Sequence, residues 1–167
     1  MVSVQYHTVT GRSIPIDSLS SREQEFLRAI ASRYSGTPPW SEFGAEWSNA
    51  FQKERLDRHS PIYRICQDLE ARLGIAQGQV APPDYRDYLQ DLIEERFGSR
   101  NRFCTATGMD PGQLSRVLRG SSDLSIKTLK EILGALNSSL VVESRDHIRE
   151  RSNPESVREE LTALTAK

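Results

Sequence analysis

Seven basic side chains gather between residues 96 and 130, where only two acidic side chains occur. The basic ones are Arg96, Arg100, Arg102, Arg116, Arg119, Lys127 and Lys130, and the acidic ones are Asp110 and Asp123. The segment therefore has a net charge of +5 in a chain whose formal net charge is −1, which leaves −6 for the rest. Exposed charges often only solvate a surface, but a basic segment in an acidic chain is typical of a module that faces a polyanion. The chemistry predicted here is the binding of phosphate groups.

No comparable pattern indicates catalysis or metal binding. The sequence has no nucleophile elbow, phosphate loop or HExxH motif, and its three histidines, His7, His59 and His147, are scattered. Carboxylates are plentiful, but we expect most of them to solvate helix faces: Asp57, Asp68, Glu70, Glu94 and Glu95. The prediction is a protein that is not an enzyme and that uses neither a metal nor a cofactor.

The cysteines and the hydropathy indicate the compartment. Cys66 and Cys104 both fall in predicted helices, which favours buried thiols in a reducing cytoplasm over a disulfide. No run of about 18 apolar residues occurs that could span a membrane. The first residues, MVSVQYHTVTGRS, lack the basic and apolar regions of a secretory signal. We therefore expect a soluble cytoplasmic protein without a membrane partner.

Residues 1–80 are expected to form a mainly helical region that begins with a short strand over residues 2–8. Alternating apolar and polar residues predict the strand. Three helices should follow. Ser20 and Glu23 have the spacing of a capping box before the first helix, and Ser60 followed by Pro61 is a typical start for the third. Small and polar residues with prolines at 74–83 predict a linker.

The stretch SRNRFCTATGMDPGQLSRVLRG, residues 99–120, predicts two short helices joined by a tight turn. Ser99 caps the first helix and Gly108 ends it, because glycine adopts the left-handed conformation without a Cβ penalty. Asp110 caps the second helix, which has Pro111 in its first turn. Two short helices joined by a glycine-containing turn of three to four residues are the signature of a helix-turn-helix.

Residues 84–137 resemble the Xre family of helix-turn-helix domains, the fold of lambda-type phage repressors and many bacterial antitoxins. The matching run is FCTATGMDPGQLSRVLRGSSDLSIKTLKEILGALN. It has the family's small residue and glycine in the turn, the Leu114–Ser115 pair in the recognition helix and the closing Gly120. The sequence departs from the family at Arg100, where glutamine is frequent. It also has Pro111 and Gly112 where long polar side chains often read bases.

The resemblance implies eight DNA-contacting residues. Arg116 is best placed to read a guanine in the major groove, and Gln113 would contact an adenine or a phosphate. The remaining six are expected to bind the phosphate backbone: Arg100, Arg102, Arg119, Ser121, Ser122 and Lys127.

The predicted fold is mainly α, with a four- to five-helix DNA-binding domain at 84–143, the helical region 1–80 before it and a charged tail at 144–167. Residues 139–143, SLVVE, favour a short strand, which could pair with the N-terminal strand or with its counterpart in a second copy. A last helix carrying Val157, Leu161 and Leu164 would either extend a dimer contact or remain exposed.

Two functions are consistent with the resemblance. The first is a sequence-specific transcriptional regulator, a repressor that binds a pseudo-palindromic operator as a homodimer. The alternative is an antitoxin that neutralises a protein toxin through residues 1–80 and represses its own operon. Both uses occur in the Xre family, and co-purification of a small basic partner would favour the antitoxin.

Overall fold

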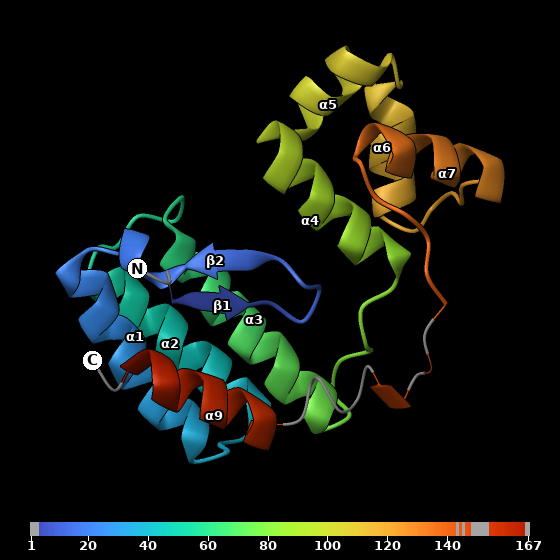
Figure 1. Ribbon diagram of the computed structural model, residues 1–167. Coiled ribbons are helices and arrows are strands. Elements are labelled where there is room, and N and C mark those ends of the chain that lie inside the picture. The colour runs from blue at the N-terminus through green and yellow to red at the C-terminus, as the bar shows by residue number, and fades with distance from the viewer. Residues whose placement is uncertain (1–3, 143, 145, 148–153, 166–167) are drawn as a thin grey trace. The chain divides into compact units, whose positions relative to one another are not determined.

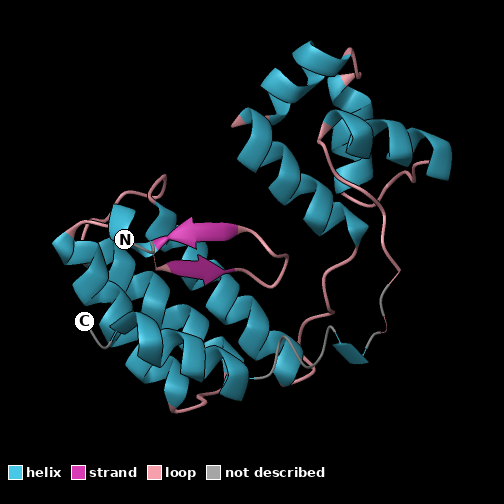
Figure 2. Cartoon of the chain, viewed as in Figure 1, coloured by secondary structure: helices cyan, strands magenta, loops and turns pink. Residues whose placement is uncertain are grey.

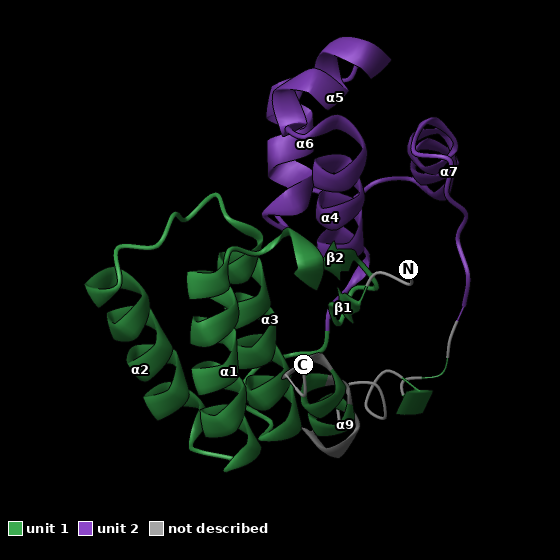
Figure 3. Cartoon of the chain, turned by 60° about the vertical axis from the view of Figure 1, so that its left-hand side comes forward, with its two compact units in different colours: residues 1–82, 144–167 green, residues 83–143 purple. Residues whose placement is uncertain are grey.

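The computed structural model describes residues 4–142, 144, 146–147 and 154–165. The chain divides into two compact units (Figures 1 and 3). Unit 1 comprises Met1–Pro82 together with Ser144–Lys167, and unit 2 comprises Pro83–Glu143. The described residues are mainly helical with one small sheet, which confirms the predicted fold class at this level (Figure 2). None of the helices described is both long and apolar enough to cross a membrane.

Within its described residues, unit 1 contains a short β-hairpin packed with α-helices. Its elements are β1 (Gln5–His7), β2 (Ser13–Pro15), a 3-10 turn (Ile16–Ser18), α1 (Ser21–Ser35), α2 (Trp40–Lys53), α3 (Pro61–Ala76) and α9 (Pro154–Thr165). β1 and β2 are antiparallel, with Tyr6 opposite Ile14 and both side chains buried. The predicted N-terminal strand is thus confirmed within its central residues, and β2 is an element that the sequence did not reveal.

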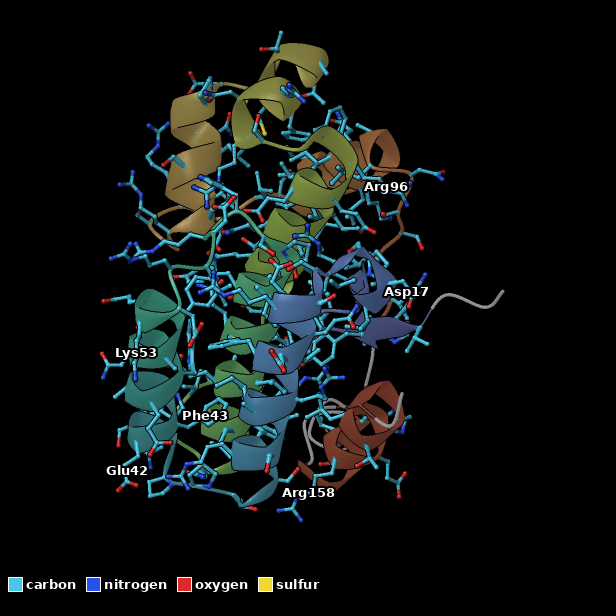
Figure 4. All side chains as sticks on the ribbon, turned by 90° about the vertical axis from the view of Figure 1, so that its left-hand side faces the viewer. Asp17, Glu42, Phe43, Lys53, Arg96 and Arg158 are labelled. Carbon is cyan, nitrogen blue, oxygen red and sulfur yellow. The ribbon has the colours of Figure 1, made fainter. Side chains whose placement is uncertain are left out.

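Local signals in the sequence correctly located α1 and α3. Ser20 and Glu23 form a capping box, and the Ser60 side chain accepts a hydrogen bond at the start of α3, where Pro61 occupies the first turn. In α2, Phe43 is fully buried and points between the helices, whereas Glu42 and Lys53 point away (Figure 4). The apolar faces of α1, α2 and α3 thus form one core.

The segment after residue 144 is part of unit 1 and not a separate tail. α9 contacts α1, α3 and β1, and Val157 and Leu161 are each only 1% exposed within the core. Their four-residue spacing places both on one face of the helix, which is buried against unit 1. The Leu164 side chain, expected on the same face, lies outside the described residues.

A buried charged pair joins α3 to the N-terminal hairpin. Asp68 is 2% exposed and accepts hydrogen bonds from the Tyr6 hydroxyl (2.6 Å), the Val9 amide (2.8 Å) and Arg72 Nε (2.6 Å). Arg72 also donates to the His7 carbonyl at 2.6 Å. The expectation that Asp68 solvates a helix face is therefore wrong. The residue is buried because the hairpin packs over it, and burial raises the pKa of Tyr6 well above its usual value.

Over residues 83–142, unit 2 contains four helices, α4 (Tyr85–Phe97), α5 (Arg100–Thr107), α6 (Pro111–Leu118) and α7 (Ile126–Ala135). Asp84 caps α4 with a capping box, and Ser125 caps α7. All four helices, with the residue that follows α7, contribute to one small core of buried residues: Leu89, Ile93, Phe103, Cys104, Leu114, Ile132 and Leu136.

The predicted strand at 139–143 is not present in its described part, because residues 139–142 have irregular backbone. Leu140, Val141 and Val142 are 47%, 72% and 94% exposed. A preference for extended structure does not create a strand without a neighbouring strand to pair with. In unit 1, the strand that pairs with β1 is β2.

Candidate nucleic-acid interface

The polypeptide between residues 99 and 118 forms two eight-residue helices joined by Gly108, Met109 and Asp110. The Ser99 side chain accepts a hydrogen bond from the Arg102 amide, and the Asp110 carboxylate accepts one from the Gln113 amide at 2.6 Å. Gly108 has φ of +73°, and its amide donates to a carbonyl of the last turn of α5. The two caps and the left-handed glycine predicted from the sequence are confirmed, so α5 ends and α6 begins within three residues.

Packing between α5 and α6 fixes which of their faces remain outside. Phe103, Leu114 and Val117 are at most 1% exposed, and Cys104 is 5% exposed. The Cys104 side chain is buried, as expected from its place in the sequence, and burial raises the pKa of its thiol. With these side chains inside, the polar residues of both helices are left at the surface.

The eight predicted DNA-contacting residues occupy four consecutive places on unit 2. They lie in the first turn of α5 (Arg100, Arg102), in α6 (Gln113, Arg116), in the following loop (Arg119, Ser121, Ser122) and in the first turn of α7 (Lys127). Seven are exposed, and Ser122 is half-buried. The loop folds back on α6, since the Ser121 hydroxyl donates to the Arg116 carbonyl at 3.2 Å.

Among the described residues, the side chains of Arg102, Gln113, Arg116 and Lys127 make no hydrogen bond or ion pair. By contrast, Arg100 donates to the Gln90 side chain at 2.9 Å, and Arg119 donates to the Ser115 carbonyl at 3.2 Å. A guanidinium or ammonium group without a protein partner binds a phosphate or a base without first breaking an interaction. Two of the predicted cationic contacts are therefore already engaged by the protein, and three are available.

Charge is distributed unevenly within unit 2. Helix α4 carries four acids and two cations, whereas the chain from the start of α5 to the end of α7 carries six cations and three acids. Two open hollows lie beside the turn after α5. Among the described residues, no three His, Cys, Asp or Glu side chains are grouped so that they could hold a metal ion. The surface of α5, α6 and α7 is thus the basic side of the unit, and we call it the basic surface.

A cluster around Arg86 was missed in the sequence. Its guanidinium donates to Asp84 Oδ2 at 2.5 Å and also to Asp123 Oδ1, and it lies 4.8 Å from the centre of the Tyr85 ring. The Tyr85 hydroxyl donates to the same Asp123 oxygen at 3.0 Å. The hydrogen bond to Asp84 raises the pKa of Arg86. No periodic signal could have revealed the cluster, because Arg86 and Asp123 are 37 residues apart.

Comparisons of the chain with protein-family models, with curated proteins and with solved structures found no match. The interpretation of the basic surface therefore rests on the residues of this chain and on their arrangement.

Proposed function

We propose that unit 2 is a helix-turn-helix domain that binds double-stranded DNA, and that the chain is a sequence-specific transcriptional regulator of the cytoplasm. The observation that carries the proposal is the α5–turn–α6 pair with three unengaged cations around it: Arg102, Arg116 and Lys127. In such a domain the second helix of the pair lies in the major groove and the preceding helix crosses the phosphate backbone.

Arg116 is the principal base reader in this proposal. It is exposed on α6 and has no partner among the described residues, and a guanidinium donates two hydrogen bonds to guanine O6 and N7. Gln113 is the second candidate, since its amide is not used in a capping box and is available for an adenine or a phosphate. Pro111 and Gly112 have no polar side chain, so base reading is concentrated on few positions.

The remaining contacts position unit 2 on the backbone. Arg102 and Lys127, in the first turns of α5 and α7, are placed for phosphates, where the helix dipole adds to the side-chain charge. Ser121 in the loop supplies a hydroxyl. One such unit covers a half-site, so we propose a homodimer on a pseudo-palindrome and, by occlusion of the operator, repression.

The first experiment selects binding sites for the full chain from random DNA duplexes and then titrates the selected duplex at several salt concentrations. We expect a pseudo-palindromic site whose affinity falls steeply with salt, because bound phosphates release their counterions. No enrichment, with only weak binding at low salt, would contradict the proposal.

Arg116→Ala is expected to weaken binding to the selected site by about 1–3 kcal/mol and to relax the base preference at one position of each half-site. Lys127→Ala should instead weaken binding to all duplexes alike and reduce the salt dependence. The matched control is Arg28→Ala, which removes an exposed arginine from α1 of unit 1. An unchanged site preference in Arg116→Ala would show that Arg116 is not the reader.

A further inference from the structure

We infer that Arg86 and Asp123 form a latch that holds the loop between α6 and α7 in position for DNA, so that the acidic Asp123 promotes binding to a polyanion. The inference rests on the proposed function and adds to it two positioning residues that contact no base. Neither residue was among those predicted to bind DNA.

The latch attaches the loop between α6 and α7 to the first turn of α4. One guanidinium of Arg86 bridges Asp84, which caps α4, and Asp123, which lies in the loop. Tyr85 contributes twice, through its ring against Arg86 and through its hydroxyl on Asp123. The Arg86 side chain is 22% exposed and that of Asp123 is 77% exposed, so the bridge lies at the surface, and the Tyr85 contacts add to it.

The loop that the latch holds is the part of the basic surface with least helical support. It runs from the end of α6 at Leu118 to the first residue of α7, Ile126, and carries Arg119, Ser121 and Ser122. Its attachments to the rest of unit 2 also include the hydrogen bonds from Ser121 to the Arg116 carbonyl, a turn at Gly120, where φ is +74°, and the partly buried Leu124. The latch is the attachment that joins the middle of the loop to α4.

The position of Asp123 requires an explanation, because the residue is an acid within a surface proposed to face phosphates. Its side chain is 77% exposed, and it is one of only two acids between residues 96 and 130, the other being the helix cap Asp110. A carboxylate near DNA repels the phosphates and by itself weakens binding. Its contacts with Arg86 and Tyr85 give it a different effect, since they order the loop before DNA arrives and thus lower the entropic cost of binding.

The latch predicts a change in DNA affinity whose sign is opposite to the one that charge repulsion alone would give. Asp123→Ala removes a negative charge from the DNA-binding side, yet we expect it to weaken binding to the selected duplex about fivefold, the upper range for loss of an exposed ion pair. The matched control is Glu131→Ala. Glu131 is an exposed acid on α7 that has no partner among the described residues, so its removal should leave affinity unchanged or raise it.

A second measurement reports the loop directly. The Ser121 amide donates to the Arg116 carbonyl at 3.0 Å, so its hydrogen exchange in the DNA-free full chain measures the order of the loop. We expect Arg86→Ala and Asp123→Ala each to lose protection at Ser121, and the double variant to lose no more than either single one. Glu131→Ala should retain the protection of the wild type.

The outcomes separate the latch from the proposed function. If the wild type selects a site and Asp123→Ala binds it as tightly as Glu131→Ala does, or retains Ser121 protection, the latch is refuted and the regulator remains. If the wild type selects no duplex, the proposed function fails, and the inference built on it fails as well. Weaker binding by Asp123→Ala, together with lost protection at Ser121, supports both.

Discussion

Asp68→Ala is expected to lower the free energy of unfolding of unit 1 by about 3–5 kcal/mol, the usual result of removing one partner from a buried ion pair. The substitution leaves the guanidinium of Arg72, which is 4% exposed, without its carboxylate. It also leaves the Tyr6 hydroxyl and the Val9 amide without their acceptor. Each unpaired buried donor adds to the destabilisation, because it loses water without gaining a protein partner.

Both tryptophans of the chain, Trp40 and Trp47, lie in unit 1, so urea unfolding followed by tryptophan fluorescence measures this unit selectively. The control is Arg33→Ala, which breaks an exposed pair with Glu46 and should lower the free energy of unfolding far less. Asp68→Asn, which retains an acceptor, should fall between the two. A loss of less than about 1 kcal/mol in Asp68→Ala would contradict the assignment of a buried, paired carboxylate.

Leu161→Ala is expected to destabilise unit 1 by about 2–5 kcal/mol, the range for truncating a buried leucine. Leu161 is 1% exposed in α9 and packs with the core formed by α1 and α3. Truncation loses the burial of its methyl groups and leaves a cavity that the surrounding helices fill only in part. The same fluorescence measurement applies.

Glu159→Ala provides the matched control for Leu161→Ala. Glu159 is exposed on the same helix of unit 1, and its truncation should have a far smaller effect. Equal effects of the two substitutions would show that α9 is an appendage and not part of the core of unit 1.

Local signals allowed most helices to be predicted from the sequence. The caps at Ser20, Ser60 and Ser99 each satisfy amides within a few residues, so the sequence of one turn is sufficient to recognise them. Asp68 and Arg72 show where such reasoning fails. A carboxylate and a cation four residues apart look the same on an exposed helix face and in a core. Their burial depends on the hairpin about sixty residues earlier in the chain.

In the candidate interface, too, some features follow from the local sequence and others depend on contacts between distant residues. The exposure of Arg102 and Arg116 follows from helical spacing once the apolar residues of α5 and α6 are assigned to the core. The bridge from Arg86 to Asp123 depends on how the chain returns to α4, which no short pattern specifies. The strand expected at 139–143 was wrong over its described residues for a related reason: a strand is a property of a pair of segments.

The order of elements along the chain affects how the protein is made. Unit 2 is inserted between α3 and α9, so the ribosome synthesises all of residues 83–143 before it reaches the helix that carries Val157 and Leu161. In the nascent chain, the apolar residues of α1 and α3 that α9 contacts are therefore still uncovered when all residues of the unit 2 core have been made. Unit 1 therefore begins first and is completed last, and until α9 is made the apolar surface that it covers is exposed to solvent.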